Sequence, residues 1–240
     1  MTIFDAIDAT WPPARVETCG PFTVRVGRGG GKRVSAASTS AVTSEAEVKD
    51  AEIRMKEIGQ TPLFMVRGEQ PALDAMLEAL DYDIVDPVVV LSGPAETVAG
   101  DGPKPVTAFP IWPPLTVMTE LWAETGIGPE RLAVMNRARG PKTGVLGRAK
   151  DHPAGCAFLS LDGHVAMLHA LEVLPDFRRS GCATNIVRGA ATWAFKEGAK
   201  TFAVLTTRAN TEAQALFTSL GMRPVEQYHY RIHSNAEAPN

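Results

Sequence analysis

The second half of the chain has a regular pattern of apolar and polar positions. Apolar side chains three or four residues apart are typical of helices with one buried face, and short alternating or continuous apolar runs are typical of strands. In chain order, the pattern predicts a helix over 115–125, strands over 143–149, 154–161 and 164–174, a helix over 183–195, a strand over 201–206, a helix over 211–220 and a strand over 225–232.

This order of elements predicts an α+β fold with a mixed α/β sheet. Asp162-Gly163 favours a hairpin turn, so the three strands before residue 183 are expected to form an antiparallel meander. The helix over 183–195 then joins two strands, and such crossovers are right-handed in nearly all known sheets. The pattern therefore predicts a sandwich in which helices cover a sheet.

The first half repeats part of this order. Its pattern predicts strands over 22–26 and 32–36 on either side of a glycine turn, a helix over 45–58, a strand over 62–66, a helix over 72–80 and a strand over 85–91. After a shift of 140 residues, Phe64 falls on Val204 and Leu77 on Phe217. Either the chain holds two similar small sheets, or the two segments share only their amphipathic pattern.

A stretch rich in proline and glycine separates the two halves. Ser92–Pro114 holds six prolines and three glycines, which interrupt helices and strand ladders, so we expect a linker there. The expected domains are residues 1–103 and 104–234, followed by a flexible tail over 235–240.

Composition and charge exclude several classes of protein. The chain has 240 residues, 45% of them hydrophobic, and a formal net charge of -3, so no overall basic field attracts nucleic acid. Residues 1–103 carry a net charge of -7 and residues 104–240 one of +4, which suits an anionic small ligand or arises by chance. Three widely spaced cysteines predict no metal site and fit reduced thiols in a cytoplasmic protein. The sequence contains neither a signal peptide pattern nor a membrane-spanning run.

The strongest chemical signal is the segment from Leu171 to Ala183. Pro175 ends a predicted strand, a short loop follows, and a helix is expected to begin near Gly181. The first turn of a helix has free amides and a partial positive charge, and both favour phosphate oxygens. Arg178 and Arg179 add positive charge. The segment therefore predicts a pyrophosphate cradle, with a plain strand-loop-helix connection as the alternative.

Two motifs in this half resemble those of the GNAT superfamily of N-acetyltransferases. Val173-Leu-Pro175 followed by Arg178-x-x-Gly181-x-Ala183 is similar to the acetyl-CoA-binding loop of that family. Asn210 to Met222 is similar to its second motif. The resemblance covers about residues 115–232 and implies an acyl-CoA N-acyltransferase sandwich. The first half looks like a degenerate GNAT-like copy without the cradle, as in tandem members of the superfamily.

The resemblance implies roles for residues in both motifs. Backbone groups of Leu171 and Val173 would pair with the pantetheine arm of acetyl-CoA, and Asn210 would reach the cofactor or the backbone near its thioester end. The pyrophosphate would be held by the loop and the first helical turn, with the residues Arg178, Arg179, Ser180, Gly181, Cys182, Ala183 and Thr184. Phe217 would contact the cofactor arm.

Phe217 stands where the family usually has a tyrosine that protonates the leaving thiolate. Phenylalanine has no proton to give. Three explanations stay open: Tyr228 or Tyr230 substitutes for it, the thiolate leaves by another route, or the site transfers poorly. The same residue also fits a plain core aromatic.

Two residues on the predicted strand 164–174 are candidates for the general base. These are Glu172 and His169, and strict alternation along a strand would point them to opposite faces, so only one could face the acceptor channel. For each of them, an ordinary structural role is the alternative. The strands over 164–174 and 201–206 would splay apart, and the acetyl group would lie in the gap.

These features predict an N-acetyltransferase that transfers an acetyl group from acetyl-CoA to a primary amine by direct attack in a ternary complex. The alternative is a non-catalytic acyl-CoA-binding or protein-interaction module. The acceptor would be the amine of a small molecule or a peptide, with neither nucleic acid nor membrane as partner. Exposed edge strands would also allow a homodimer.

Overall fold

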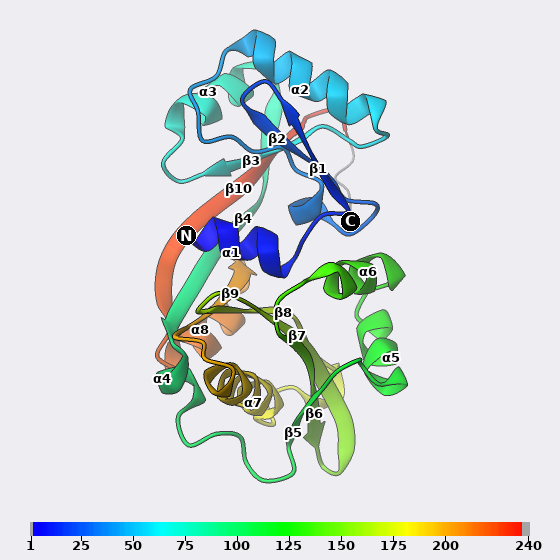
Figure 1. The fold of residues 1–240 in the computed structure, drawn as a ribbon, viewed down its shortest axis with the longest axis vertical. Coiled ribbons are helices and arrows are strands. Elements are labelled where there is room, and N and C mark those ends of the chain that lie inside the picture. Colours follow the sequence, from blue (N-terminus) through cyan, green and yellow to red (C-terminus); the bar gives the residue numbers. More distant parts are fainter. Residues whose placement is uncertain (1, 237–240) are drawn as a thin grey trace. The chain divides into compact units, whose positions relative to one another are not determined.

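The computed structural model describes residues 2–236, which form two compact units (Figure 1). Unit 1 consists of residues 2–12, 90–206 and 210–225. Unit 2 consists of residues 13–89, 207–209 and 226–236. Each unit therefore combines segments that are far apart in the sequence.

Unit 1 contains most of the helices and strands predicted for the second half of the chain. Its elements are α1 (Ile3–Thr10), the end of β4 (Tyr82–Pro94), α4 (Ala95–Ala99), β5 (Ala108–Ile111), α5 (Thr116–Glu124), α6 (Pro129–Arg137), β6 (Lys142–Ala149), β7 (His152–Asp162), β8 (Val165–Val173), a 3-10 turn (Pro175–Phe177), α7 (Cys182–Lys196), β9 (Thr201–Thr207), α8 (Thr211–Ser219) and the start of β10 (Arg223–His233).

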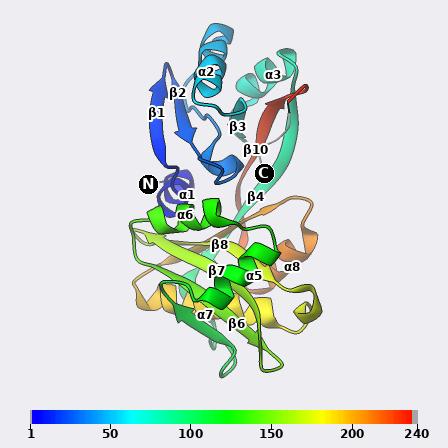
Figure 2. The same ribbon diagram turned by 90° about the vertical axis from the view of Figure 1, so that its right-hand side faces the viewer.

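The sheet of unit 1 has the strand order β10-β4-β9-β8-β7-β6-β5. Strands β5 to β8 form an antiparallel meander, and β8 pairs in parallel with β9 after the chain has passed through α7. Helix α7 covers one face of this sheet and α5 the other (Figures 1 and 2). The mixed α+β fold with its meander and crossover is thus confirmed.

Glycines bring both helix layers close to the strands. A Cβ on Gly147 of β6 would come within 2.5 Å of side-chain carbons of Ile186 on α7. A Cβ on Gly144 would come within 2.5 Å of the Met118 side chain on α5. Because these positions lack side chains, α7 packs directly on the sheet, and this contact sets where its first turn lies.

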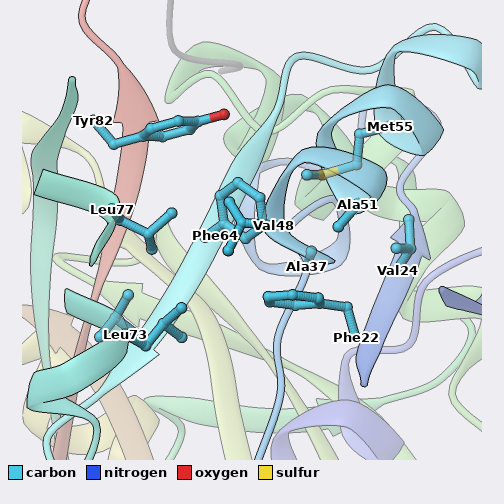
Figure 3. Packing of buried hydrophobic residues seen from close by; sticks show 11 residues of the cluster. Phe22, Val24, Ala37, Val48, Ala51, Met55, Phe64, Leu73, Leu77 and Tyr82 are labelled. Carbon is cyan, nitrogen blue, oxygen red and sulfur yellow. The ribbon is translucent and has the colours of Figure 1, made fainter. Parts of the chain in front are cut away.

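Unit 2 is built around its own apolar core. Its elements are β1 (Arg15–Cys19), β2 (Phe22–Val26), a 3-10 turn (Lys32–Val34), α2 (Glu45–Glu57), β3 (Leu63–Arg67), α3 (Pro71–Ala79), most of β4 and most of β10. Figure 3 shows Val48, Ala51 and Met55 of α2 packed towards Phe64 of β3. The spacing of these three residues is that of one helix face, which explains why the sequence predicted this helix.

The shift of 140 residues matches elements as well as residues. Helix α3 falls on α8, β3 falls on β9, and β4 falls on β10. The strand beside β9 in unit 1 is β4, and the strand beside β3 in unit 2 is β10. Each segment therefore gives its last strand to the sheet that contains the first strand of the other segment. A common origin of the two halves stays a prediction.

The compact units do not follow the predicted ranges 1–103 and 104–234. Helix α1, from the first half, packs against β7 and β8 in unit 1. Strands β4 and β10 each have residues in both units. Hydrophobic periodicity locates a strand but does not say which strand it pairs with, and this explains the difference. Of the expected tail, residues 237–240 lie outside the described range.

The expected linker over 92–114 is also wrong. This stretch contains the end of β4, helix α4 and strand β5. The amide of Ala95 donates a hydrogen bond of 2.9 Å to the carbonyl of Lys200, and α4 packs against α7. Pro110 is tolerated in β5 because that strand is at the edge of the sheet, where a missing amide costs no ladder bond.

The expected return strand over 32–36 is wrong as well. Lys32–Val34 forms a 3-10 turn, and the partner of β2 is the unpredicted strand β1. Gly31, with φ 93°, leads directly into that turn. Helix α6 was not predicted either; it lies in the stretch after residue 126 that the pattern left as a loop.

Candidate functional site

A groove of about 850 Å³ lies in unit 1, beside the end of β8 and the first turns of α7 and α8. It collects ten of the thirteen residues that the sequence predicted for the site. These ten are Leu171, Glu172, Val173, Arg178, Arg179, Gly181, Cys182, Ala183, Thr184 and Asn210. The sequence thus predicted most of this groove.

Strands β8 and β9 part at the groove. Their parallel register runs from Val165↔Thr201 to Leu168↔Val204, whereas β8 continues to Val173 and β9 to Thr207. Beyond Leu168, the backbone of β8 therefore has an edge that no longer pairs with β9. Leu171 and Val173 line the groove there. Such an edge can take an extended ligand in place of a strand.

The first turn of α7 has the geometry of an anion site. The helix begins after Gly181, which has φ 83° and provides no side-chain cap. Arg179 also has a left-handed backbone, with φ 59°. The amides of the first helical turn therefore lack the side-chain oxygen that usually binds them, and the helix dipole adds partial positive charge. The groove thus has peptide donors and arginine side chains at the same end.

The structure shows why residue 181 is a glycine. A Cβ at this position would meet no atom within 4 Å, so space is not the constraint. The positive φ is the constraint, because residues with a Cβ rarely adopt it. Gly181 thus reverses the chain into α7 without placing a side chain over the first turn.

A bulge in β8 changes the direction of the candidate bases. Phe158 of β7 pairs with His169 of β8, and Cys156 of β7 pairs with Glu172 of β8. The step between the two pairs is two residues on β7 but three residues on β8, so β8 contains one extra residue. The extra residue is accommodated at Ala170, which has φ 50°. Directly paired residues share a face of the sheet, so His169 and Glu172 lie on the same face. The expectation that they point to opposite faces is therefore wrong.

Glu172 combines partial burial with nearby positive charge. Burial raises the pKa of its carboxyl group, while the charges of Arg178 and Arg131 act in the opposite direction. The Nε of Arg178 also donates a hydrogen bond of 3.3 Å to the carbonyl of Val173, which fixes this arginine beside the strand end. A carboxylate with a raised pKa can accept a proton more readily at neutral pH than an ordinary one.

His169 lies in the packed layer beneath the bulge and is 4% exposed. Its Nε2 atom is 2.9 Å from the Thr10 hydroxyl, and that hydroxyl donates its proton to the carbonyl of Ala6 at 2.6 Å. His169 is therefore the donor to Thr10. Its ring also packs against Trp11, with ring centroids 5.0 Å apart. It does not line the groove.

Ser180 and Phe217 also lie outside the groove lining. The exposed Ser180 donates a hydrogen bond of 2.6 Å to the carbonyl of Phe177 and closes the loop before α7. Phe217 is 4% exposed, as expected for a core aromatic. Asn210 lines the groove while its Oδ1 accepts the Ala213 amide at 3.1 Å, so it caps α8.

Several groove residues were missed by the sequence reasoning. They are Phe177, Thr211, Glu212, Ala213, Ala215, Leu216 and Ser219. Glu212, Ala215, Leu216 and Ser219 recur at three- to four-residue spacing along the predicted helix, so they form one face of it. Once Asn210 was expected to reach the ligand, that spacing could have indicated the whole face.

Other ionisable side chains are poor candidates for proton transfer in this groove. Tyr228 and Tyr230 belong to the unit 2 part of β10, and the Tyr230 hydroxyl donates a hydrogen bond of 3.4 Å to that of Tyr228. Burial raises the pKa of the Cys182 thiol to about 11, so the thiol is neutral and a poor nucleophile. Among residues 2–236, no cluster of three His, Cys, Asp or Glu could hold a metal ion.

A smaller cavity of about 210 Å³ lies in unit 2, beside the first turn of α3. Asp74 lines it and accepts hydrogen bonds of 2.8 Å from His229 and 2.7 Å from Arg231. Burial acts to raise the pKa of Asp74, but these two hydrogen bonds and charges outweigh it and lower the pKa below its usual value. This carboxylate is thus engaged by side chains of its own unit.

Comparison with known proteins agrees with this geometry. Residues 115–222 match the model of the acetyltransferase (GNAT) family. The protein has a GNAT fold. A GCN5-related N-acetyltransferase from Kribbella flavida is similar in structure, with a TM-score of 0.74, 18% identity, and coverage of 98% of this chain and 95% of that one.

Two further proteins are similar over nearly the whole chain. An uncharacterized N-acetyltransferase, YobR from Bacillus subtilis (strain 168), is 23% identical over 233 residues, which are 93% of this chain and 94% of that protein. A tandem GNAT protein from the clavulanic acid biosynthesis pathway has a TM-score of 0.64 and 12% identity, covering 96% of this chain and 87% of its own. These comparisons show that the fold is that of GNAT proteins and that residues 115–222 resemble the acetyltransferase (GNAT) family.

None of the helices within residues 2–236 has the length and apolar character needed to cross a membrane.

Proposed function

We propose that this protein transfers an acetyl group from acetyl-CoA to a primary amine, with both substrates bound together. One observation carries the proposal: the uncapped first turn of α7 and the parted edge of β8 line the same groove. The anion-binding turn suits the pyrophosphate of CoA, and the free strand edge suits its extended pantetheine arm. The match to the family supports the same reaction class.

The groove residues offer donors suited to acetyl-CoA. The first-turn amides of α7, with Arg178 and Arg179, bind the pyrophosphate oxygens. The backbone of Leu171 and Val173 pairs with the amides of the pantetheine arm. The thioester then lies next to the bulge of β8, close to Glu172. The proposal needs no metal ion.

The chemistry begins with a neutral amine, because an ammonium group has no lone pair for attack. Glu172 therefore accepts one proton from the ammonium form of the substrate, and the second proton that the nitrogen must lose passes to solvent as the carbon–sulfur bond breaks. The nitrogen then forms a bond to the thioester carbonyl carbon, and the negative charge that develops on the carbonyl oxygen is stabilised by a backbone amide of the bulge, with Leu171 as the candidate donor. The carbon–sulfur bond breaks, and CoA leaves as a thiolate. Holding both substrates in one groove lowers the entropic part of the barrier.

The thiolate needs a proton or a positive field. Phe217 supplies no proton, but the first turn of α8 lines the groove at Asn210 and Thr211. The positive end of the helix dipole therefore stabilises the leaving sulfur until solvent protonates it. This route accounts for transfer without a tyrosine in the second motif.

A second function, binding of acyl-CoA without catalysis, is favoured by one observation, the phenylalanine at position 217 in place of a proton donor. Binding and catalysis are separated by one experiment with two readouts. The melting temperature is measured with and without CoA, and release of free thiol from acetyl-CoA is followed across a panel of amino acid, polyamine and peptide amines.

We expect CoA to raise the melting temperature, since a ligand that binds only the folded state stabilises it, and thiol to be released with at least one amine. Stabilisation without thiol release across the panel would favour the binding function. If CoA has no effect on melting, both functions fail.

A further inference from the structure

The bulge of β8 requires outside support. Ala170 has φ 50°, a left-handed conformation that alanine rarely adopts unless neighbouring contacts impose it. The strand register shows the extra residue of the bulge, because β8 takes three residue steps from His169 to Glu172 while β7 takes two between their partners. If this extra residue were absorbed elsewhere in the strand, Glu172 would turn to the other face. The position of the proposed base therefore depends on whatever holds Ala170.

Trp122 provides one of these contacts. It lies in α5, is fully buried, and its indole Nε1–H donates a hydrogen bond of 2.9 Å to the carbonyl of Ala170. The end of α5 is itself tied down, because the amide of Ile127 donates a hydrogen bond of 2.8 Å to the carbonyl of Trp122. A buried indole with a fixed backbone has little freedom to move, so it holds the bulge carbonyl in one place.

Gly155 provides the second contact, from the neighbouring strand. It pairs with Val173, and a Cβ at this position would lie 2.4 Å from the carbonyl oxygen of Glu172. Such a distance is impossible for real atoms, so any larger residue would push the end of β8 away. The glycine thus leaves the space into which the bulged strand fits.

The groups around Glu172 determine how a displacement of this part of β8 would change the environment of its carboxyl group. Arg178 from the loop before α7 and Arg131 from α6 act on its charge, and the Cys156 thiol from β7 lies close enough to feel that charge. Burial is the main influence on this carboxyl group. A bulge that relaxes would move the carboxyl relative to the packed layer and expose it to more water.

We propose that Trp122 is a positioning residue, which fixes the bulge of β8 through the Ala170 carbonyl and thereby directs the Glu172 carboxyl and the Leu171 amide into the groove. Trp122 acts through the strand and does not line the groove. The catalytic part of this inference rests on the proposed acetyl transfer, whereas the structural part does not.

The test compares Trp122→Phe with Trp193→Phe. The first keeps an aromatic ring and removes the N–H donor. The second makes the same exchange on α7, on the opposite face of the sheet, and serves as the matched control. The pKa of Glu172 is followed by carbon NMR of labelled glutamate, with the Glu172→Gln spectrum to assign the signal. The kcat and the KM for acetyl-CoA are measured in parallel.

We expect Trp122→Phe to lower the pKa of Glu172 towards its ordinary value and to reduce kcat at least tenfold, with a smaller change in the KM for acetyl-CoA because the pyrophosphate end of the groove, at α7, is untouched. Trp193→Phe leaves the titration unchanged. An unchanged titration in Trp122→Phe would overturn the inference. If the wild-type protein transfers no acetyl group but the titration still moves, the proposed function fails and the positioning role stands.

Gly155→Ala supplies an independent variant should Trp122→Phe fail to fold. It disturbs the bulge from the opposite strand and leaves the indole in place. The same fall in the pKa of Glu172 is expected. A normal titration in this variant would show that the bulge does not set the environment of Glu172.

Discussion

Helices α2 and α7 occupy related places in their halves, but they begin in opposite ways. Helix α2 starts with a capping box, in which the Ser44 hydroxyl accepts the Glu47 amide and the Glu47 carboxylate accepts the Ser44 amide at 2.8 Å. Helix α7 starts after Gly181 with no side-chain cap. The difference teaches that a helix can either satisfy its first-turn amides internally or keep them available for a ligand.

The neighbouring helices show a different contrast, because α8 has a side-chain cap, from Asn210, and α3 has none. In unit 2, Gln70 before α3 uses its side chain on the chain itself: Oε1 accepts the Arg67 amide and Nε2 donates to the carbonyl of Thr39. Pro71 then begins α3 without an amide hydrogen. In unit 1, the first turn of α8 opens on the large groove. The first turn of α3 thus adjoins the smaller cavity of about 210 Å³, whereas the first turn of α8 adjoins the groove of about 850 Å³.

The largest expected effect concerns the chemistry of the open groove. Glu172→Gln removes the proposed base and should lower kcat by about 100-fold or more, with CoA binding retained. Because the base works when deprotonated, the rate of the wild-type protein should rise with pH through the pKa of Glu172, which burial places above the usual 4.5. Steady-state kinetics against pH measure both effects. Glu120→Gln, on α5, is the control, and equal rates in both variants would exclude Glu172 as base.

The next largest effect is expected when the first turn of α7 is given a side-chain cap. Gly181→Asp places a negative cap at the first turn and should weaken CoA binding by about 100-fold, whereas Gly181→Asn tolerates the same left-handed backbone without the charge and should weaken it by less than about tenfold. Isothermal titration with CoA measures the two affinities. Equal affinities for the two variants would mean that the pyrophosphate binds elsewhere.

A smaller effect concerns the stability of unit 2. Asp74→Asn leaves the buried Arg231 without its carboxylate and should lower the free energy of unfolding by about 2–3 kcal/mol at neutral pH. The pKa of Asp74 is lowered in the folded state, so its contribution is present above its unfolded value near 3.8 and is lost as pH falls through the lower, folded value. Urea unfolding at several pH values should therefore show the variant and the wild type converging in acid. A difference that grows in acid would contradict this assignment.

The smallest effect is expected when the side-chain cap of α2 is removed. Ser44→Ala removes the cap and should cost about 1 kcal/mol of stability. Since α2 lacks the left-handed glycine and the adjacent arginines of α7, CoA affinity should not change. Denaturation and CoA titration of one variant test both statements. A gain of a second CoA site would show that capping alone separates the two helices.

Much of this site could be predicted from the sequence because its determinants are local. Pro175, Arg178 and Gly181 lie within seven residues, and strand end, loop and helix start follow from their backbone preferences. The helix face that begins at Asn210 has a visible spacing. Such short-range signals do not depend on which strands pair, and so the groove was found although the compact units do not follow the predicted ranges.

The bulge at Ala170 could not be predicted in this way. The sequence around His169 and Glu172 contains no signal for an extra residue. The local expectation for a strand is that side chains alternate between its two faces, and the bulge breaks this alternation. Its supports, Trp122 and Gly155, lie 48 and 15 residues from Ala170 and meet it only in the folded sheet. Tertiary contacts thus decided the one orientation that matters most for the chemistry.

The exchange of final strands also bears on how the chain is made. Unit 2 draws β10 from a much later segment of the chain, and Tyr228–Ile232 pair with β3, which was synthesised more than 150 residues earlier. The sheet of unit 2 therefore cannot be completed during translation of the first half. Until β10 has been synthesised, β3 has an unsatisfied edge, a feature that favours aggregation of nascent chains and delays folding of this unit.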